Sequence, residues 1–264
     1  MSYFEEETAI VRTGPLSYAG ELHRGWRIGE VPNGGYVLAV AGRALRESLP
    51  HRDPLAVNAF FLSPTRLGPL QCSIEVLRVG RNTSHAVARL YQDDELKVQV
   101  TAAYSVLDSR QGETWLAGPA LELPPIEACI EHRRSELEFH QRVDLRLATG
   151  AGVFTAAGSD GSGEFSGYVQ HRDGAPPDVL SLLMFADAFP PPAYSVLGVV
   201  GWVPTVELSV QVRAHPSPGP LRVRLSSRFL TRGVVEEDGE YWDSQGSLVA
   251  LSRQTALVRV PKTQ

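Results

Sequence analysis

One pattern occurs twice in this chain, once in each half. Residues 55–107 and residues 203–260 both run through a Gly-Pro-Leu turn and then alternate apolar with polar side chains. The two leucines of these turns, Leu70 and Leu221, lie 151 residues apart (221 − 70). One apolar helical stretch precedes each copy: 35–49 and 177–189. The chain is therefore predicted to repeat one unit, made of a strand pair, a helix and a four-strand antiparallel meander.

Turn residues divide each copy into predicted strands. In the first copy these are 8–13, 18–26, 55–66, 70–80, 83–92 and 95–107. In the second copy they are 137–148, 163–171, 203–214, 219–231, 234–243 and 247–260. Between the copies, a stretch rich in glycine and proline has no periodicity, which is typical of a connection. We therefore expect an N-terminal unit over 1–115, a linker over 116–135 and a C-terminal unit over 136–264.

Charge and cysteine content exclude several classes of protein. The net charge is −5 and the isoelectric point is near 5.8, without a basic run interleaved with aromatics, so nucleic acid is not an expected partner. Cys72 and Cys129 are predicted to be free thiols in a reducing cytoplasm. The seven histidines do not cluster, so no metal site is expected. The acidic N-terminus and the lack of an apolar run of about 18 residues argue against secretion and a membrane span.

Asp187 is the first candidate for chemistry. It shares one face of the predicted second helix with Leu180, Leu183 and Met184, whereas the first helix has no carboxylate between Gly34 and Arg46. A carboxylate in apolar surroundings is costly, and such groups gather at functional sites. The alternative is that Asp187 ends the helix and reaches solvent, and the sequence leaves both possibilities open.

Six motifs resemble those of the double hot-dog acyl-CoA thioesterases of the thioesterase II type. In the first half they are Val31–Ala39, Phe60–Pro64 and Glu75–Arg81. In the second half they are Phe185–Phe189, Pro204–Ser209 and Val249–Arg259. The resemblance covers nearly the whole chain. It implies an α+β fold, the double hot-dog, in which two antiparallel β-sheets each wrap around a central α-helix.

The resemblance also implies an activity and a site. The catalytic Asp, Thr and Gln of the family fall on Asp187, Thr205 and Gln254, although Thr205 and Gln254 taken singly would be read as solvated strand residues. The implied reaction is hydrolysis of acyl-CoA to free acid and CoA by a homo-oligomer that needs no cofactor. In one departure, Glu207-Leu208 stands where the family has Asp-His.

The residue types suit that reaction. Asp187 would take a proton from a water that Thr205 and Gln254 hold against the thioester carbonyl. The turn at Gly34, Gly35 and Tyr36 offers backbone N–H groups at a helix N-terminus, where an oxyanion could bind. A plain tight turn explains these glycines nearly as well.

Two rival functions remain open at this point. One is a non-catalytic hot-dog protein that binds an acyl chain or acyl-CoA, because the departure at Glu207-Leu208 affects the site. The other is a hot-dog hydratase, which needs an Asp and a His close together, and no histidine offers that pairing in the sequence. A serine hydrolase is disfavoured, because the chain has no Gly-x-Ser-x-Gly motif.

Overall fold

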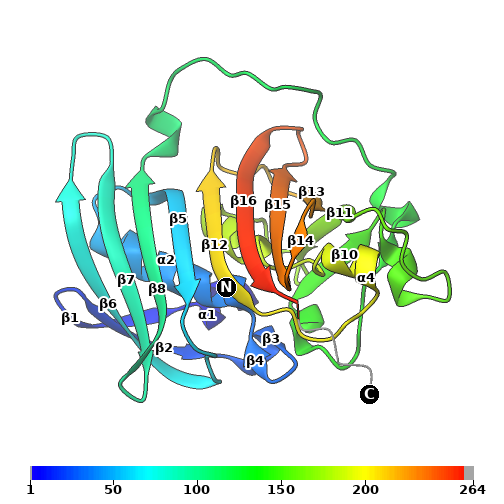
Figure 1. The fold of residues 1–264 in the computed structure, drawn as a ribbon. Coiled ribbons are helices and arrows are strands. Elements are labelled where there is room, and N and C mark those ends of the chain that lie inside the picture. Colours follow the sequence, from blue (N-terminus) through cyan, green and yellow to red (C-terminus); the bar gives the residue numbers. More distant parts are fainter. Residues whose placement is uncertain (1, 259–264) are drawn as a thin grey trace.

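The computed structural model describes residues 2–258, so the last residues of the predicted strand 247–260 lie outside the described residues. Within them, one antiparallel sheet of 14 strands runs through both halves of the chain (Figure 1). The first half supplies, in spatial order, β1 (Ile10–Gly14), β2 (Ser17–Leu22), β6 (Gly68–Val79), β7 (Ser84–Gln92), β8 (Glu95–Ser105) and β5 (Asp53–Phe61). The second half continues with β12 (Thr205–Val212), β16 (Leu248–Leu257), β15 (Val234–Trp242), β13 (Leu221–Ser226), β11 (Glu164–His171), β10 (Val143–Leu147) and β9 (Ile130–Glu131).

Smaller elements complete the structure. β14 (Leu230–Thr231) pairs with β15, and β3 (Arg27–Ile28) pairs with β4 (Val31–Pro32). Two short helices that we did not predict are α1 (Tyr3–Glu7) and α4 (Ala193–Leu197). Single 3₁₀ turns lie at Arg24–Trp26, Leu107–Ser109, Ile126–Ala128, Glu138–Gln141 and Ala151–Phe154. The turn at Glu138–Gln141 replaces the first part of the predicted strand 137–148.

The sheet repeats its strand order on either side of its centre. β5 and β12 pair there, with Asn58 directly opposite Ser209. These two residues lie 151 residues apart (209 − 58), which is the offset of the sequence repeat. Outward from them, β8, β7 and β6 on one side correspond to β16, β15 and β13 on the other. The duplication read from the sequence is therefore also a duplication of strand order.

The predicted four-strand meander is wrong in one respect. β6, β7 and β8 pair consecutively, but β5 pairs with β8 and β12 and not with β6. The second half does the same, because β12 pairs with β16 and β5 and not with β13. An edge strand leaves its outer N–H and C=O groups without partners in the sheet. By pairing with each other, β5 and β12 satisfy those groups at the centre of the sheet.

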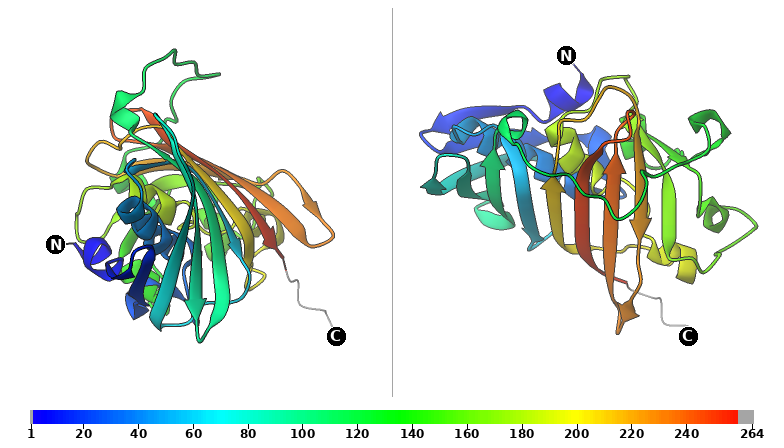
Figure 2. Two further views of the ribbon diagram at one scale, coloured as in Figure 1. Left: turned by 90° about the vertical axis from the view of Figure 1, so that its left-hand side faces the viewer. Right: turned by 90° about the horizontal axis from the view of Figure 1, so that it is seen from above.

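Two helices lie on the concave face of the curved sheet (Figure 2). α2 (Gly34–Ser48) contacts β5, β6, β7 and β8, and α3 (Val179–Phe185) contacts β5 and β12. The two helices pack against each other where α2 has glycines on one face. A Cβ at Gly35 would lie 2.3 Å from the carbonyl oxygen of Met184, and one at Gly42 would lie 2.8 Å from Leu183 Cδ1. Only glycine allows this close approach of α2 and α3.

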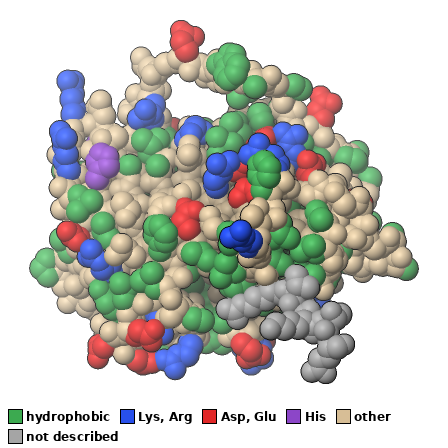
Figure 3. Space-filling model, viewed as in Figure 1, with side chains coloured by type: hydrophobic (Ala, Val, Ile, Leu, Met, Phe, Trp, Pro, Cys, Tyr) green, Lys and Arg blue, Asp and Glu red, His purple; other side chains and the backbone are tan. Residues whose placement is uncertain are grey.

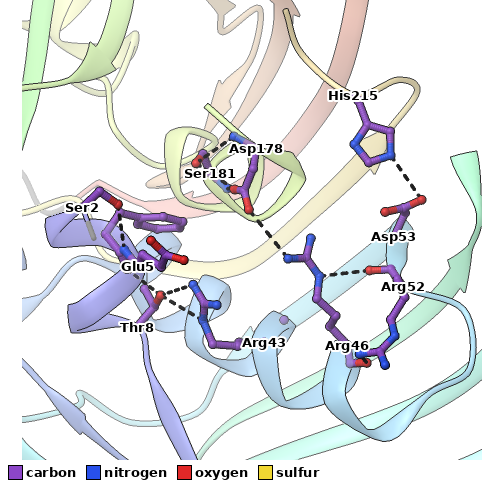
Figure 4. A network of polar contacts seen from close by, with 12 residues as sticks. Ser2, Glu5, Thr8, Arg43, Arg46, Arg52, Asp53, Asp178, Ser181 and His215 are labelled. Carbon is purple, nitrogen blue, oxygen red and sulfur yellow. Dashed lines mark hydrogen bonds and ion pairs between the residues drawn. The ribbon is translucent and has the colours of Figure 1, made fainter. Parts of the chain in front are cut away.

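A polar contact also joins the C-terminal part of α2 to the N-terminus of α3 (Figure 4). Asp178 caps α3 through a reciprocal pair of hydrogen bonds with Ser181, a capping box. An Asp178 oxygen also lies 3.7 Å from Arg46 Nη1 on α2. At the start of β5, His215 Nε2 lies 3.3 Å from an Asp53 carboxylate oxygen. These contacts join the first half of the chain to the second.

The outer face of the sheet carries hydrophobic side chains among charged ones of both signs (Figure 3). Both cysteines, Cys72 and Cys129, are free and buried. No helix within residues 2–258 is long and apolar enough to cross a membrane.

Candidate active site

A pocket of about 450 Å³ lies between the two halves of the chain. Its wall includes Asp187, Thr205 and Gln254, so the structure brings the three predicted catalytic side chains into one cavity. The first half contributes the start of α2 and the end of β5, and the second half contributes the loop after α3, the start of β12 and residues of β13, β15 and β16. Most of the remaining wall is apolar.

Asp187 lies two residues beyond the end of α3 rather than on its face. The helix ends at Phe185, and the Asp187 N–H then donates to the Met184 carbonyl. The predicted helix 177–189 was therefore too long at both ends. The Asp187 side chain keeps some exposure and lines the pocket, so the helix end places the carboxylate in the cavity.

The first half of the chain holds this carboxylate. Asp187 Oδ2 accepts hydrogen bonds from the Gly35 N–H (3.1 Å) and from Asn33 Nδ2 (2.9 Å). Asn33 Nδ2 also donates to the Asp187 carbonyl oxygen (2.7 Å), while Asn33 Oδ1 caps α2 by accepting from the Tyr36 N–H. One asparagine thus begins the helix of one half and positions the acid of the other.

Burial and hydrogen bonding have opposite effects on the pKa of Asp187. Burial raises it to about 6, although the backbone N–H groups of Gly35 and Gly34 and the Asn33 amide act to lower it. A carboxyl with this pKa is mostly ionised at neutral pH and is still basic enough to accept a proton in a reaction.

Thr205 and Gln254 form a pair on the inner side of the sheet. Thr205 begins β12, Gln254 lies on the neighbouring β16, and Gln254 Nε2 donates to Thr205 Oγ1 at 2.8 Å. Gln254 is buried. Among the hydrogen bonds of the described residues, none joins Asp187 to either side chain. The three groups line one cavity.

The backbone N–H groups of the turn that was predicted to bind an oxyanion form hydrogen bonds within the protein. The Gly35 N–H donates to Asp187, and the Tyr36 N–H donates to Asn33. The Tyr36 ring is buried and stacks on Trp26 with the ring centroids 5.1 Å apart. Only Gly34 of this turn lines the pocket. The Gly35 and Tyr36 N–H groups therefore already have acceptors, and the Gly34 N–H is directed at the Asp187 carboxylate, whose pKa it helps to lower.

The family departure at Glu207-Leu208 lies outside the pocket. Leu208 is completely buried in the core. Glu207 Oε1 accepts from Ser209 Oγ (2.6 Å) and from the Asn58 amide, at the centre of the sheet. Glu207 therefore forms hydrogen bonds where β5 pairs with β12.

Sequence reasoning missed one carboxylic acid in the pocket wall. Glu237 lies on β15 directly opposite Gln254, is only 6% exposed and lines the cavity. Burial, then the charges of Asp187 and Glu236, raise the pKa of Glu237 to about 8. The alternation of Val235, Glu237, Gly239 and Tyr241 along the strand was a signal that could have placed it on the inner face.

Comparison with known proteins agrees with this architecture. Residues 22–106 match the family model of an acyl-CoA thioesterase N-terminal domain, and residues 120–258 match that of an acyl-CoA thioesterase C-terminal domain. The crystal structure of a candidate thioesterase II from Thermobifida fusca is 32% identical, covers 98% of both chains and superposes with a TM-score of 0.91. A hot-dog protein of unknown function from Alicyclobacillus acidocaldarius is 22% identical over 99% of both chains, with a TM-score of 0.88.

A curated relative extends the comparison. An uncharacterised protein of Mycobacterium tuberculosis is 28% identical over 269 residues, which cover 91% of this chain and 90% of the relative. Fold and pocket together define a hot-dog protein of the thioesterase class. With family models matching both halves, the chain belongs to the acyl-CoA thioesterase family.

Proposed function

We propose that this protein hydrolyses acyl-CoA thioesters to the free acid and CoA. The observation that carries the proposal is the convergence of Asp187, Thr205 and Gln254 on one largely apolar pocket. We further propose that the architecture is a double hot-dog, with units over 1–115 and 136–264 and a linker over 116–135. The site forms once per chain, since only the second unit supplies this set of side chains.

In the proposed mechanism, a water molecule attacks the thioester carbonyl. The Thr205 hydroxyl and the Gln254 amide hold this water, since each can both donate and accept hydrogen bonds. Asp187 takes its proton as the C–O bond forms. The thiolate of CoA then leaves with the electron pair of the C–S bond and takes this proton from Asp187, which returns to its ionised form. CoA thiol and a carboxylic acid are the products.

The oxyanion of this reaction needs donors that are already in place. We propose Gly34 for this role, because it lines the pocket at the N-terminus of α2. Gly35 and Tyr36 would support it indirectly, since their N–H groups fix Asp187 and the helix cap.

Asp187→Asn tests the proposal. We expect kcat to fall by about 10²- to 10⁴-fold, because the amide cannot accept the proton. Release of free thiol from a panel of acyl-CoAs measures this. Asp108→Asn is the matched control, since the Asp108 side chain is exposed and is not part of the pocket wall. Near-normal turnover by Asp187→Asn would remove Asp187 from the mechanism.

The same assay separates the enzyme from its rival, a non-catalytic acyl-CoA-binding protein. That protein would bind acyl-CoA in a calorimeter and release no thiol. Such a result would leave the pocket as a binding site and end the hydrolase proposal.

A further inference from the structure

The strand order places the pocket residues in a row across the sheet. Phe61 ends β5, Thr205 begins β12, and Gln254, Glu237 and Leu225 lie on β16, β15 and β13 in that order. Glu237 is thus one strand beyond Gln254, on the side away from Thr205. Neighbouring strands lie about 4.8 Å apart, a distance that a few carbon atoms of an acyl chain span.

The two ends of this row differ in exposure. Leu62 (56%), Trp202 (50%) and Val206 (37%) lie at the end near β5 and β12 and are open to solvent. Glu237 and Leu225 are buried at the other end. The nucleotide part of CoA is large and charged and must remain in solvent, so an acyl chain bound at Gln254 points toward Glu237.

Glu237 has an unused hydrogen-bonding atom at this closed end. Its Oε1 is buried and has no hydrogen-bond partner among the described residues. The described part of the pocket wall contains no Lys, Arg or His, and its other titratable side chains are Asp187 and Tyr194. A buried polar atom without a partner is costly, so a ligand that pairs with it binds better than one that does not.

We propose that Glu237 selects acyl-CoA substrates whose acyl chain carries a hydroxyl group a few carbons from the thioester. This inference rests on the proposed thioesterase function and adds the substrate class. The hydroxyl hydrogen-bonds to the Glu237 carboxyl, which a plain alkyl chain would leave unpaired. Because burial raises the pKa of Glu237 to about 8, the carboxyl is neutral at pH 7 and can both donate to and accept from the hydroxyl.

Matched substrates test this selection. For the wild-type protein at pH 7, we expect kcat/KM for 3-hydroxyhexanoyl-CoA to exceed that for hexanoyl-CoA by at least about 10-fold, because pockets that bind a substrate hydroxyl reject the analogue without it. Glu237→Gln keeps a donor and an acceptor and should retain most of the ratio. Glu237→Leu has neither, and its ratio should approach one. Thermal melting of each variant shows that it is folded.

The outcomes separate the two proposals. A ratio near one in the wild-type protein, as when a water molecule satisfies Glu237, would overturn the selection, as would a ratio that survives in Glu237→Leu. If the wild-type protein hydrolyses neither compound, the thioesterase proposal fails. In that case, calorimetric Kd values for the same CoA esters still test the selection, because the preference should be present in the wild type and lost in Glu237→Leu.

Discussion

Asp187 is placed and tuned by groups from the opposite half of the chain. Burial alone would favour its neutral form, and the Gly35 N–H and the Asn33 amide offset part of that effect. α2 has no carboxylate in its first turn, and its N-terminus donates a hydrogen bond to Asp187 of the second half.

The first prediction concerns the pH dependence of catalysis. Because the pKa of Asp187 is raised to about 6 and the ionised form is the base, kcat/KM should fall about tenfold per pH unit below pH 6. This can be checked by measuring kcat/KM from pH 4.5 to 8 with an acyl-CoA that saturates the enzyme. Asp108→Asn should give the same profile. An acid limb near the ordinary value of a carboxyl, about 4, would contradict the role of Asp187.

The second prediction concerns stability and Glu237. The pKa of a glutamate carboxyl in water is ordinarily 4.5, and burial raises that of Glu237 to about 8 in the folded protein. The folded protein therefore binds this proton more tightly than the unfolded chain does. The free energy of unfolding of the wild type should fall as pH rises from about 5 to about 8, by about 1 kcal/mol per pH unit from this group.

Glu237→Gln cannot ionise and should lose this dependence. Urea unfolding at pH 5, 7 and 8.5 measures the difference in stability between the variant and the wild type, which should shift in favour of the variant as pH rises. Asp187 and Glu236, the charged neighbours of Glu237, are present in both proteins. A difference that does not change with pH would show that Glu237 is ionised throughout.

Asp187 and Glu237 also differ in how visible they are in the sequence. Asp187 could be found because a carboxylate in an apolar stretch is conspicuous. Glu237 lies in the run Glu236-Glu237-Asp238, which has the composition of a solvated strand. Within this run, the alternation of Val235, Glu237 and Tyr241 along the strand is the signal that separates the inward-facing Glu237 from its neighbours.

At the scale of elements, the positions of the long strands and the consecutive pairing of β6, β7 and β8 were predictable, and the partners of β5 and β12 were not. Alternation fixed β6, β7 and β8 to within a few residues, since their turns are short. It could not show that β5 leaves β6 to pair with β8 and β12, because side-chain alternation is the same for either neighbour. Which strands β5 pairs with depends on the contact between the two halves of the chain.

The contact of α2 with α3 supplies a third prediction. A Cβ at Gly35 would lie 2.3 Å from the Met184 carbonyl oxygen, and neither backbone can yield easily. Gly35→Ala should therefore destabilise the protein by about 1–3 kcal/mol and displace Asp187 from its donors. Gly118→Ala is the control, because its Cβ would meet nothing within 4 Å. Equal melting temperatures for the two variants would show that the helices can move apart without loss.

At the scale of the whole molecule, the connection between the halves is far less buried than their interface. Residues 108–118 are all exposed, and the segment arches over the top of the sheet (Figure 1). The interface, in contrast, contains the β5–β12 pairing and the packing of α2 on α3. The sheet therefore does not depend on this segment for its integrity.

The fourth prediction follows from that contrast. A protease site inserted between Gly112 and Glu113 should be cut readily, and the two fragments should stay together with native circular dichroism and most of the thiol-release activity. Size-exclusion chromatography after cleavage checks this, with the uncut protein as reference. Fragments that separate in buffer without denaturant would show that the covalent connection holds the halves together.

The hydrogen bonds from Asn33 and Gly35 to Asp187 have one more consequence. They cross from one half of the chain to the other, so the proton affinity of the acid depends on how well the halves are aligned. A small slip along the β5–β12 junction would withdraw these donors while the strands themselves remained formed. On the proposed mechanism, such a misalignment would lower the rate of hydrolysis while the rest of the molecule stayed folded.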